Sequence, residues 1–455
     1  MQKNAHRLSI IGMGKLGSPM AAVMARAGFD VIGLDTQASV VAELNLGRAP
    51  VREPQLQEYL DQSQGRLRAT TDYRDAVLNS DISFLILPTP SGDDYLFSND
   101  YLLESIKAIG SVLREKTGYH LIVITSTTMP GSTEGVIRQT LERTSGRRVG
   151  DRLGLCYNPE FIALGSVIRD MSQPDFVLIG ESDSQAGDLL ERVHQAYLPP
   201  GTPVQRMSCV NAELAKISIN TYVTTKISYA NMLAELCEHL PGADVDVVTR
   251  AVGSDSRIGS KYLKGALGYG GPCFPRDNKA FYSLGKKLGV RCDLAEATDR
   301  INDHQILRLS KTVHDHASGC KTVSILGLAY KPDTGVIDAS QGLALARQLQ
   351  QSGYQVTVHD PMANALARQS LPPDIAVSDE MEAALSASST VVLVTPWPAF
   401  REIATLAEQN PKLRTVIDPW RLLSHEHLPP RIKLVQMGRT PPDDPPLANA
   451  NSAAR

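Results

Sequence analysis

One cysteine lies where the chain could form a reactive thiol. Cys273 follows the glycine run of GYGGPCFPRD and directly precedes Phe274 and Pro275. Proline is favoured at the first position of a helix, so we expect Cys273 at a helix N-terminus, where the dipole stabilises a thiolate. Arg276 adds positive charge, and Asp277, four residues after the cysteine, could act as a base or orienting group. The competing interpretation is a buried structural cysteine.

Two further polar residues lie together on a long helical stretch. Lys216 and Asn220 of AELAKISIN are four residues apart, which places them on one face of a helix. Apolar neighbours surround Lys216, so a lysine extending from the helix face to solvent is the alternative. In the thiol segment, Tyr269 and Gly270 belong to GYGG, whose glycines let the backbone approach a ligand closely.

The N-terminus carries a dinucleotide-binding pattern. GMGKLG places Gly12, Gly14 and Gly17 in G-x-G-x-x-G, directly after an apolar strand and at the start of a helix. Asp35 lies 18 residues beyond Gly17, at the end of the next strand, where its carboxylate can accept hydrogen bonds from an adenosine ribose. The same carboxylate would repel a 2′-phosphate, so the pattern favours NAD over NADP.

An NAD site and an activated thiol together indicate aldehyde oxidation. The thiolate would add to an aldehyde and form a thiohemiacetal, and loss of hydride would leave a thioester. Hydrolysis would then release the acid. On this interpretation the glycines admit the substrate, and the helix start activates the sulfur of Cys273.

The elements around these residues indicate two nucleotide-binding folds. Apolar strands at 81–90, 120–127 and 175–180 alternate with helices, which is typical of a parallel sheet covered on both faces. The stretch 211–240 lacks glycine and proline and predicts a helix roughly 45 Å long. After it, segments 321–330, 353–361 and 389–398 repeat the opening order without the glycine fingerprint, and Lys331 stands at the corresponding turn.

We therefore predict an α/β fold: two Rossmann-like doubly wound parallel-sheet domains joined by a long central helix. The expected parts are an NAD-binding domain, a helical dimerisation and catalytic segment, a domain for another nucleotide, and a disordered Pro- and Asn-rich tail. Their boundaries are 1–205, 206–305, 306–438 and 439–455.

Composition narrows the function classes. The 455 residues are too many for one core, and 42% hydrophobic with 21% charged residues is ordinary for a globular protein. A net charge of −3 argues against a nucleic-acid or anionic-membrane partner, and no run of 18 apolar residues predicts a membrane span. Six scattered cysteines without a CxxC pair, and ten histidines without ligand spacing, predict no disulfide framework and no metal site. We expect a cytoplasmic protein.

With these motifs in place, residues 7 to 435 closely resemble the UDP-glucose/GDP-mannose dehydrogenases. This resemblance implies oxidation of the C6 alcohol of a nucleotide sugar to a carboxylate with two NAD. It also implies a homodimer built on the long helix, with the nucleotide of the substrate held largely by the last domain. Further matching segments are LPTPS at 87–91, TSTTMPGST at 125–133, NPEF at 158–161 and DSRIG at 255–259.

The resemblance assigns roles residue by residue. It makes Cys273 the nucleophile, with Asp277 as base or water-orienting group and Lys216 with Asn220 stabilising the oxyanion. Glu160 would assist thioester hydrolysis, and Thr127 would help hold water. Thr89, Pro90 and Thr127 join the glycine motif and Asp35 at the cofactor. The residues implied at the substrate are Glu160, Phe161, Lys216, Asn220, Arg257, Tyr269, Gly270 and Lys331, with Arg257 reaching the substrate of the partner subunit.

The sequence departs from the family at three places. Ala163 and Leu164 stand where the family has arginine and glutamate, Asp338 stands where it has arginine, and Arg276 replaces a lysine and keeps its charge. The first two changes remove a carboxylate from the sugar or hydrolysis site and alter a phosphate or cofactor contact. They indicate a subgroup distinct from the best-known UDP-glucose enzymes.

The leading hypothesis is a four-electron UDP-glucose 6-dehydrogenase, because the family's GDP-mannose branch tends to carry leucine in place of Phe274. GDP-mannose, a dTDP-hexose and a UDP-N-acetylhexosamine are alternative substrates. A two-electron β-hydroxyacid dehydrogenase would leave Cys273 and the last domain idle. A non-catalytic nucleotide-sugar binder would explain Leu164 and Asp338 as decay, but not the intact set of candidate catalytic residues.

Overall fold

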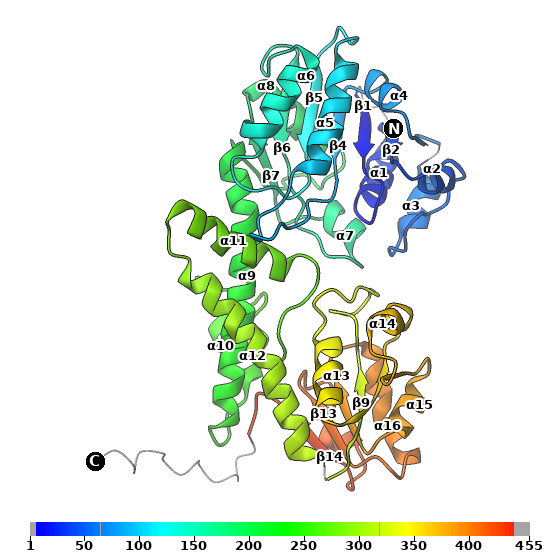
Figure 1. The fold of residues 1–455 in the computed structure, drawn as a ribbon, viewed down its shortest axis with the longest axis vertical. Coiled ribbons are helices and arrows are strands. Elements are labelled where there is room, and N and C mark those ends of the chain that lie inside the picture. The colour runs from blue at the N-terminus through cyan, green and yellow to red at the C-terminus, as the bar shows by residue number, and fades with distance from the viewer. Residues whose placement is uncertain (1–5, 64, 318, 441–455) are drawn as a thin grey trace. The chain divides into compact units, whose positions relative to one another are not determined.

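The computed structural model describes residues 6–63, 65–317 and 319–440, which fall into two compact units, Met1–Ser218 and Ile219–Arg455 (Figure 1). Of the tail expected at 439–455, only Arg439 and Thr440 are described, and the rest lies outside the described residues. Across the described ranges, no helix combines the length and the apolar character that crossing a membrane requires.

The first unit is built on an eight-stranded sheet in the order β3-β2-β1-β4-β5-β6-β7-β8. Its strands are β1 Arg7–Ile11, β2 Asp30–Leu34, β3 Leu67–Thr70, β4 Ile82–Leu85, β5 His120–Ile124, β6 Leu153–Tyr157, β7 Val177–Glu181 and β8 Val204–Ser208. All neighbours pair in parallel except β6 and β7, which pair antiparallel through Cys156 opposite Glu181 and Tyr157 opposite Gly180. The doubly wound parallel design is therefore confirmed with one reversed pair.

Helices cover both faces of this sheet (Figure 1). They are α1 Gly17–Arg26, α2 Ala38–Asn45, α3 Leu56–Gln62, α4 Tyr73–Leu78, α5 Asp100–Leu113, the π-helical turn η1 Thr133–Ile137, α6 Arg138–Ser145, α7 Val167–Ser172 and α8 Ser184–Gln195. One apolar cluster joins α1, α7 and α8 to one sheet face, and a second joins α4, α5 and α6 to the other. Strands buried on both faces explain the near-continuous apolar runs of the sequence.

The long helix is α9, Cys209–Glu238, with 30 residues. It begins two residues before the expected Asn211 and ends two residues before Leu240. The boundary between the two units, Ser218/Ile219, falls within it.

The second unit contains α10 Val245–Gly253, α11 Phe274–Leu288 and α12 Asp293–His316, followed by a second sheet. That sheet is fully parallel in the order β11-β10-β9-β12-β13-β14. Its strands are β9 Thr322–Leu326, β10 Gln355–His359, β11 Ala376–Val377, β12 Thr390–Leu393, β13 Thr415–Asp418 and β14 Lys433–Gln436. The remaining helices are α13 Gln341–Gln351, α14 Asn364–Ser370, α15 Met381–Ser386, η2 Pro398–Glu402, α16 Ile403–Gln409 and η3 His425–His427.

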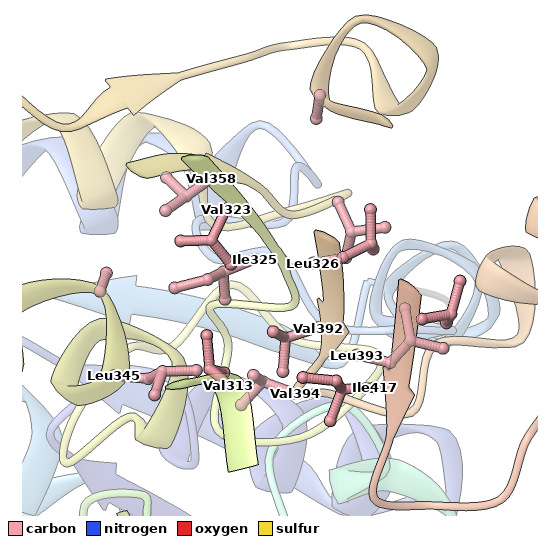
Figure 2. Close-up of a cluster of buried hydrophobic side chains, with 14 of the residues drawn as sticks. Val313, Val323, Ile325, Leu326, Leu345, Val358, Val392, Leu393, Val394 and Ile417 are labelled. Carbon is pink, nitrogen blue, oxygen red and sulfur yellow. The ribbon is translucent and has the colours of Figure 1, made fainter. Parts of the chain in front are cut away.

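Figure 2 shows the core of this second sheet. Buried valine, isoleucine and leucine side chains from β9, β10, β12 and β13 pack with Leu345 of α13 and Val313 of α12. The sheet and α12 therefore share one apolar core. Together the two sheets and α9 confirm the expected fold class.

Candidate active site

The glycine fingerprint forms a turn between β1 and α1 that only glycine can make. Gly12 has φ +96°, and a β-carbon there would overlap the carbonyl oxygen of Ile86. A β-carbon at Gly17 would overlap the carbonyl oxygen of Gly12, so this glycine sets the close packing of helix on strand. Gly14 has no atom within 4 Å of its missing β-carbon. The exposed backbone at Gly14 leaves the open approach that a pyrophosphate needs at a helix N-terminus.

Asp35 lies beside this turn, immediately after β2. Its Oδ2 accepts a hydrogen bond of 2.8 Å from the backbone N–H of Met13, and its Oδ1 accepts one of 2.9 Å from Gln37. The carboxylate is thus fixed next to the glycine turn, with lone pairs remaining on both oxygens. These residues fit a dinucleotide whose ribose hydroxyls donate to Asp35.

The loops that follow β4 and β5 are joined by side-chain hydrogen bonds. Thr89 Oγ1 donates to the carbonyl oxygen of Thr127 at 2.7 Å. Ser126 Oγ donates to the carbonyl oxygen of Leu87 and accepts from its N–H, both at 2.8 Å. Pro90 accepts a backbone hydrogen bond from Ser98. The structure therefore brings Thr89 and Thr127 together at the carboxyl edge of a parallel sheet, where ligands of such folds bind.

Lys216 lies against the loop after β6. Its Nζ donates to the carbonyl oxygen of Glu160 at 2.7 Å and lies 4.5 Å from the centre of the Phe161 ring. Lys216 is only 7% exposed, so it does not extend into solvent. Although residue Glu160 is partly exposed, burial of its carboxyl group raises its pKa to about 7, and the Lys216 ammonium opposes that rise.

A buried network that the sequence did not reveal supports this loop. Asn158, two residues before Glu160, accepts from His194 Nε2 at 2.9 Å and donates to the carbonyl oxygen of Leu178. Tyr197 donates to His194 Nδ1 at 2.7 Å, which fixes the imidazole tautomer. Burial lowers the pKa of His194 to about 4, so the ring is neutral near pH 7. No spacing rule links these residues, because α8 and the β6 loop meet only in the fold.

The departures at Ala163 and Leu164 lie in the same loop. Leu164 packs against the apolar core beneath α1 and α7, alongside Ile162. The backbone N–H of Ala163 donates to Asp170. Apolar contacts thus occupy the place where the resemblance expects a charged pair.

In the second unit, Cys273 is exposed and is the N-cap residue of α11. Pro275 is the second helical residue rather than the first, and the helix start expected at the cysteine is present. One turn on, Asp277 is 1% exposed and accepts a 2.6 Å hydrogen bond from Asn220 Nδ2 of α9. Arg276 pairs with its other oxygen at 3.2 Å. An exposed thiol at a helix start, one turn before a buried and oriented carboxylate, can act as a nucleophile with that carboxylate as a candidate base.

The glycine run before Cys273 packs closely against the loop after β9. A β-carbon at Gly270 would overlap the carbonyl oxygen of Ala339, and Gly271, with φ +86°, lies against the ring of Tyr330. The N–H of Gly271 donates to the carbonyl oxygen of Asp338 at 2.8 Å, while the Asp338 side chain is exposed. The departure at Asp338 therefore supports the thiol segment through its backbone.

Helix α12 anchors Tyr269, a second contact that the sequence did not reveal. Asn302 accepts from the N–H of Tyr269 at 2.6 Å and donates to its carbonyl oxygen at 3.1 Å. The Tyr269 hydroxyl donates to Asp299, and the ring meets Phe274 edge-on at 6.5 Å. The hydroxyl is thus already bound within the protein.

The remaining predicted substrate residues are less enclosed. Arg257 follows α10, its side chain is 86% exposed, and its guanidinium pairs with Asp255 at 2.6 Å. Lys331 is half-buried and lies after the end of β9. The structure thus places Arg257 on the surface of its unit.

Comparison with known proteins assigns all three parts of the chain to one family. Models of the UDP-glucose/GDP-mannose dehydrogenase family match in sequence order: the NAD binding domain at residues 6–198, the central domain at 210–304 and the UDP binding domain at 324–425. UDP-glucose 6-dehydrogenase AglM of Haloferax volcanii is 36% identical over 423 residues, which cover 92% of this chain and 97% of that protein.

Other relatives differ in their named substrate. The GDP-mannose 6-dehydrogenase of Pseudomonas putida is 32% identical over 358 residues, covering 78% of this chain and 80% of that protein. The structure of a UDP-glucose dehydrogenase from Pyrobaculum islandicum matches with a TM-score of 0.87 and 31% identity, over 96% of this chain and 98% of that one.

Proposed function

Because the chain belongs to the UDP-glucose/GDP-mannose dehydrogenase family, we propose that it oxidises UDP-glucose to UDP-glucuronate through a thioester on Cys273. Membership itself makes the chain an NAD-dependent oxidoreductase that acts on the CH–OH group of a nucleotide sugar. The substrate and the covalent route are the proposed steps. The observation that carries the route is the exposed Cys273 thiol at the start of α11, one turn before the buried Asp277.

We assign the cofactor to the first unit. Gly12, Gly14 and Gly17 would hold its pyrophosphate, Asp35 would hold its ribose, and the joined Thr89 and Thr127 loops would border it. Pro90 belongs to the same loop. When bound, NAD supplies the hydride acceptor, and two equivalents are needed for each alcohol oxidised to a carboxylate.

The other chemical roles would fall to side chains of the protein. The Cys273 thiolate attacks the aldehyde carbon and forms a C–S bond, and water later breaks that bond in the thioester. Lys216 and Asn220 stabilise the negative charge that develops on the substrate oxygen. Asp277, oriented by Asn220, accepts a proton or orients water, as does Glu160 with its pKa near neutrality. Thr127 would help to hold that water.

We further propose that residues 306–438, which include Lys331, bind the UDP part of the substrate. Phe161, Arg257, Tyr269 and Gly270 lie outside this range and would be further substrate contacts. Within this range the family's UDP binding domain matches 324–425. Residues 206–305 would form the dimer interface. On α9 the exposed apolar side chains Tyr222, Tyr229, Met232 and Leu236 support this, because contiguous exposed apolar surface commonly marks an interface. Arg257, exposed on its own unit, would then contact a partner's substrate.

The test is the NADH formed per mole of UDP-glucose, measured at 340 nm with wild type and Cys273→Ser. Wild type should form two NADH per sugar, and the variant at most one, because the Cys273 thiolate acts only after the alcohol has become an aldehyde. Cys320→Ser is the matched control, because Cys320 is also an exposed cysteine of the second unit. It should keep the wild-type stoichiometry.

Other outcomes would redirect the proposal. One NADH per substrate, unaffected by Cys273→Ser, would indicate a two-electron dehydrogenase. No NADH from UDP-glucose would refute the substrate, and GDP-mannose, dTDP-glucose and UDP-N-acetylhexosamines would be assayed next. Binding of one of these without any NADH would favour a non-catalytic binder.

A further inference from the structure

A fully buried carboxylate at the start of α9 has no role in the chemistry above. Glu213 is 0% exposed and lies three residues before Lys216. Its Oε1 accepts from Thr128 Oγ1 at 3.0 Å, from the N–H of Thr133 at 2.8 Å and from Thr133 Oγ1 at 2.6 Å. Its Oε2 accepts from the N–H of Gly131 at 2.6 Å. Four donors from one short loop therefore converge on a single side chain.

That loop connects β5 to the turn η1 and has little regular structure of its own. It contains Pro130 and Gly131, the latter with φ +91°, which rules out helix or strand geometry at this point. Charge-assisted hydrogen bonds donated to a carboxylate are among the stronger polar contacts in proteins. Glu213 thus substitutes for the missing backbone pairing and determines the shape of residues 128–133.

The same loop borders the cofactor site. Thr127 directly precedes it, and the carbonyl of Thr127 accepts from Thr89. Asn99 Nδ2, just before α5, also donates to Ser132 Oγ at 3.1 Å. A displacement of 128–133 would therefore move Thr127 and disturb the joined loops at the carboxyl edge of the sheet.

Glu213 also connects this loop to Lys216. Both residues lie in the first turns of α9, and Lys216 binds the Glu160 carbonyl. All of these contacts lie within Met1–Ser218. One helix end thus holds the β5 loop through a carboxylate and the β6 loop through an ammonium.

We propose that Glu213 is a positioning residue for the cofactor. It holds residues 127–133 in the conformation that binds NAD and fixes their position relative to Lys216. The inference rests on the proposed cofactor site of this unit. It assigns a function to a residue that touches neither of the reacting atoms.

The primary variant is Glu213→Gln, which keeps the size of the side chain and replaces one acceptor oxygen by a donor NH₂. At least one of the four donors then faces another donor and loses its partner. We expect the dissociation constant of NAD, measured by calorimetric titration of the full-length protein, to rise about tenfold. The KM for NAD should rise more than the KM for the nucleotide sugar.

His120→Gln is the matched control. His120 is also 0% exposed. It is the first residue of β5, whereas the loop that Glu213 holds follows the last residue of this strand. It bonds to Ser83 Oγ at 2.8 Å and Lys116 Nζ at 3.0 Å, so its loss also breaks buried hydrogen bonds. We expect lower thermal stability but an NAD dissociation constant within about twofold of wild type.

Thr133→Val is the second variant, in case Glu213→Gln does not fold. It removes one donor and keeps the other three satisfied, so we expect a rise in the NAD dissociation constant of about threefold. If Glu213→Gln and Thr133→Val both bind NAD as tightly as wild type does, the inference fails and the proposed function stands. Equal weakening by His120→Gln would also overturn the inference. A wild type that does not bind NAD would overturn the cofactor site and this inference together.

Discussion

The raised pKa of Glu160 makes a prediction that does not depend on the substrate. Burial raises the pKa of this carboxyl group to about 7, against an ordinary value of 4.5. The folded protein therefore holds a proton that the unfolded chain releases. Glu160→Gln removes the titration but keeps the backbone carbonyl to which Lys216 donates.

The size of the effect follows from linkage. Stability changes with pH in proportion to the protons bound by the unfolded chain minus those bound by the folded protein, and between pH 4.5 and 7 the folded protein binds more. The contribution of Glu160 to the free energy of unfolding therefore falls as pH rises through this window. A difference of about 2.5 pKa units corresponds to about 3 kcal/mol.

The assay is calorimetric melting of wild type and Glu160→Gln from pH 4.5 to 8.5. The melting temperature of the variant minus that of wild type should increase steadily up to about pH 7 and then level off. For a unit of about 200 residues, 3 kcal/mol corresponds to a rise of about 6–12 °C. Glu104→Gln, which removes an exposed carboxylate on α5, is the control for loss of a charge at the surface.

The two tryptophans, Trp397 and Trp420, both lie in the second unit, so their fluorescence follows that unit separately. Their transition should shift less than the calorimetric transition of the first unit. A melting-temperature difference that stays constant from pH 4.5 to 8.5 would refute the reasoning, because it would mean that Glu160 titrates alike in the folded and unfolded states.

Two other predictions follow from local packing. Gly14→Ala should leave the melting temperature within about 1 °C of wild type but weaken NAD binding more than tenfold, because the site is open and the side chain would meet the pyrophosphate; Gly12→Ala should instead destabilise the first unit by more than about 2 kcal/mol. Equal effects of the two changes on stability would contradict this assignment. Arg421→Met should destabilise the second unit by about 3–5 kcal/mol in urea unfolding followed by tryptophan fluorescence, because this 2% exposed guanidinium binds Asp246 and the carbonyls of Gly265 and Met437. Arg368→Met, which breaks the exposed pair with Asp379, is the control, and a loss below 1 kcal/mol for Arg421→Met would contradict the prediction.

The parts of the fold that were predictable from sequence are those set by local signals. The strand, glycine turn, helix and terminal aspartate at 7–35 follow from short-range sterics, and the structure contains each of them. Strand ends were less predictable: β4 stops at Leu85, before the Pro-Thr-Pro segment that was included in the expected strand. Proline lacks the N–H that a sheet ladder requires, which explains the earlier end.

The reversed pair β6–β7 could not be predicted in the same way. Helix α7 separates the two strands, and a helix between strands normally indicates a parallel crossover. Here the connection instead returns to the same end of the sheet. Strand β7 therefore runs antiparallel to β6, and Cys156 lies opposite Glu181. Strands β3, β6 and β8 were not anticipated because polar residues or glycine interrupt their short apolar runs, which read LRAT, LGLCY and VQRMS.

In the candidate site, too, features set by local sequence were predictable, and contacts between distant segments were not. Cys273 and Asp277 are related by one helical turn, and the spacing alone predicted that both lie at the start of a helix. The contacts that orient them depend on segments distant in sequence: Asn220 reaches Asp277 across 57 residues, and Glu213 reaches Thr133 across 80. A motif therefore identifies the groups that can react, whereas the groups that hold them in place follow only from the packed structure. Variants at Glu213 test that second set directly, because they leave Cys273 and Asp277 unchanged.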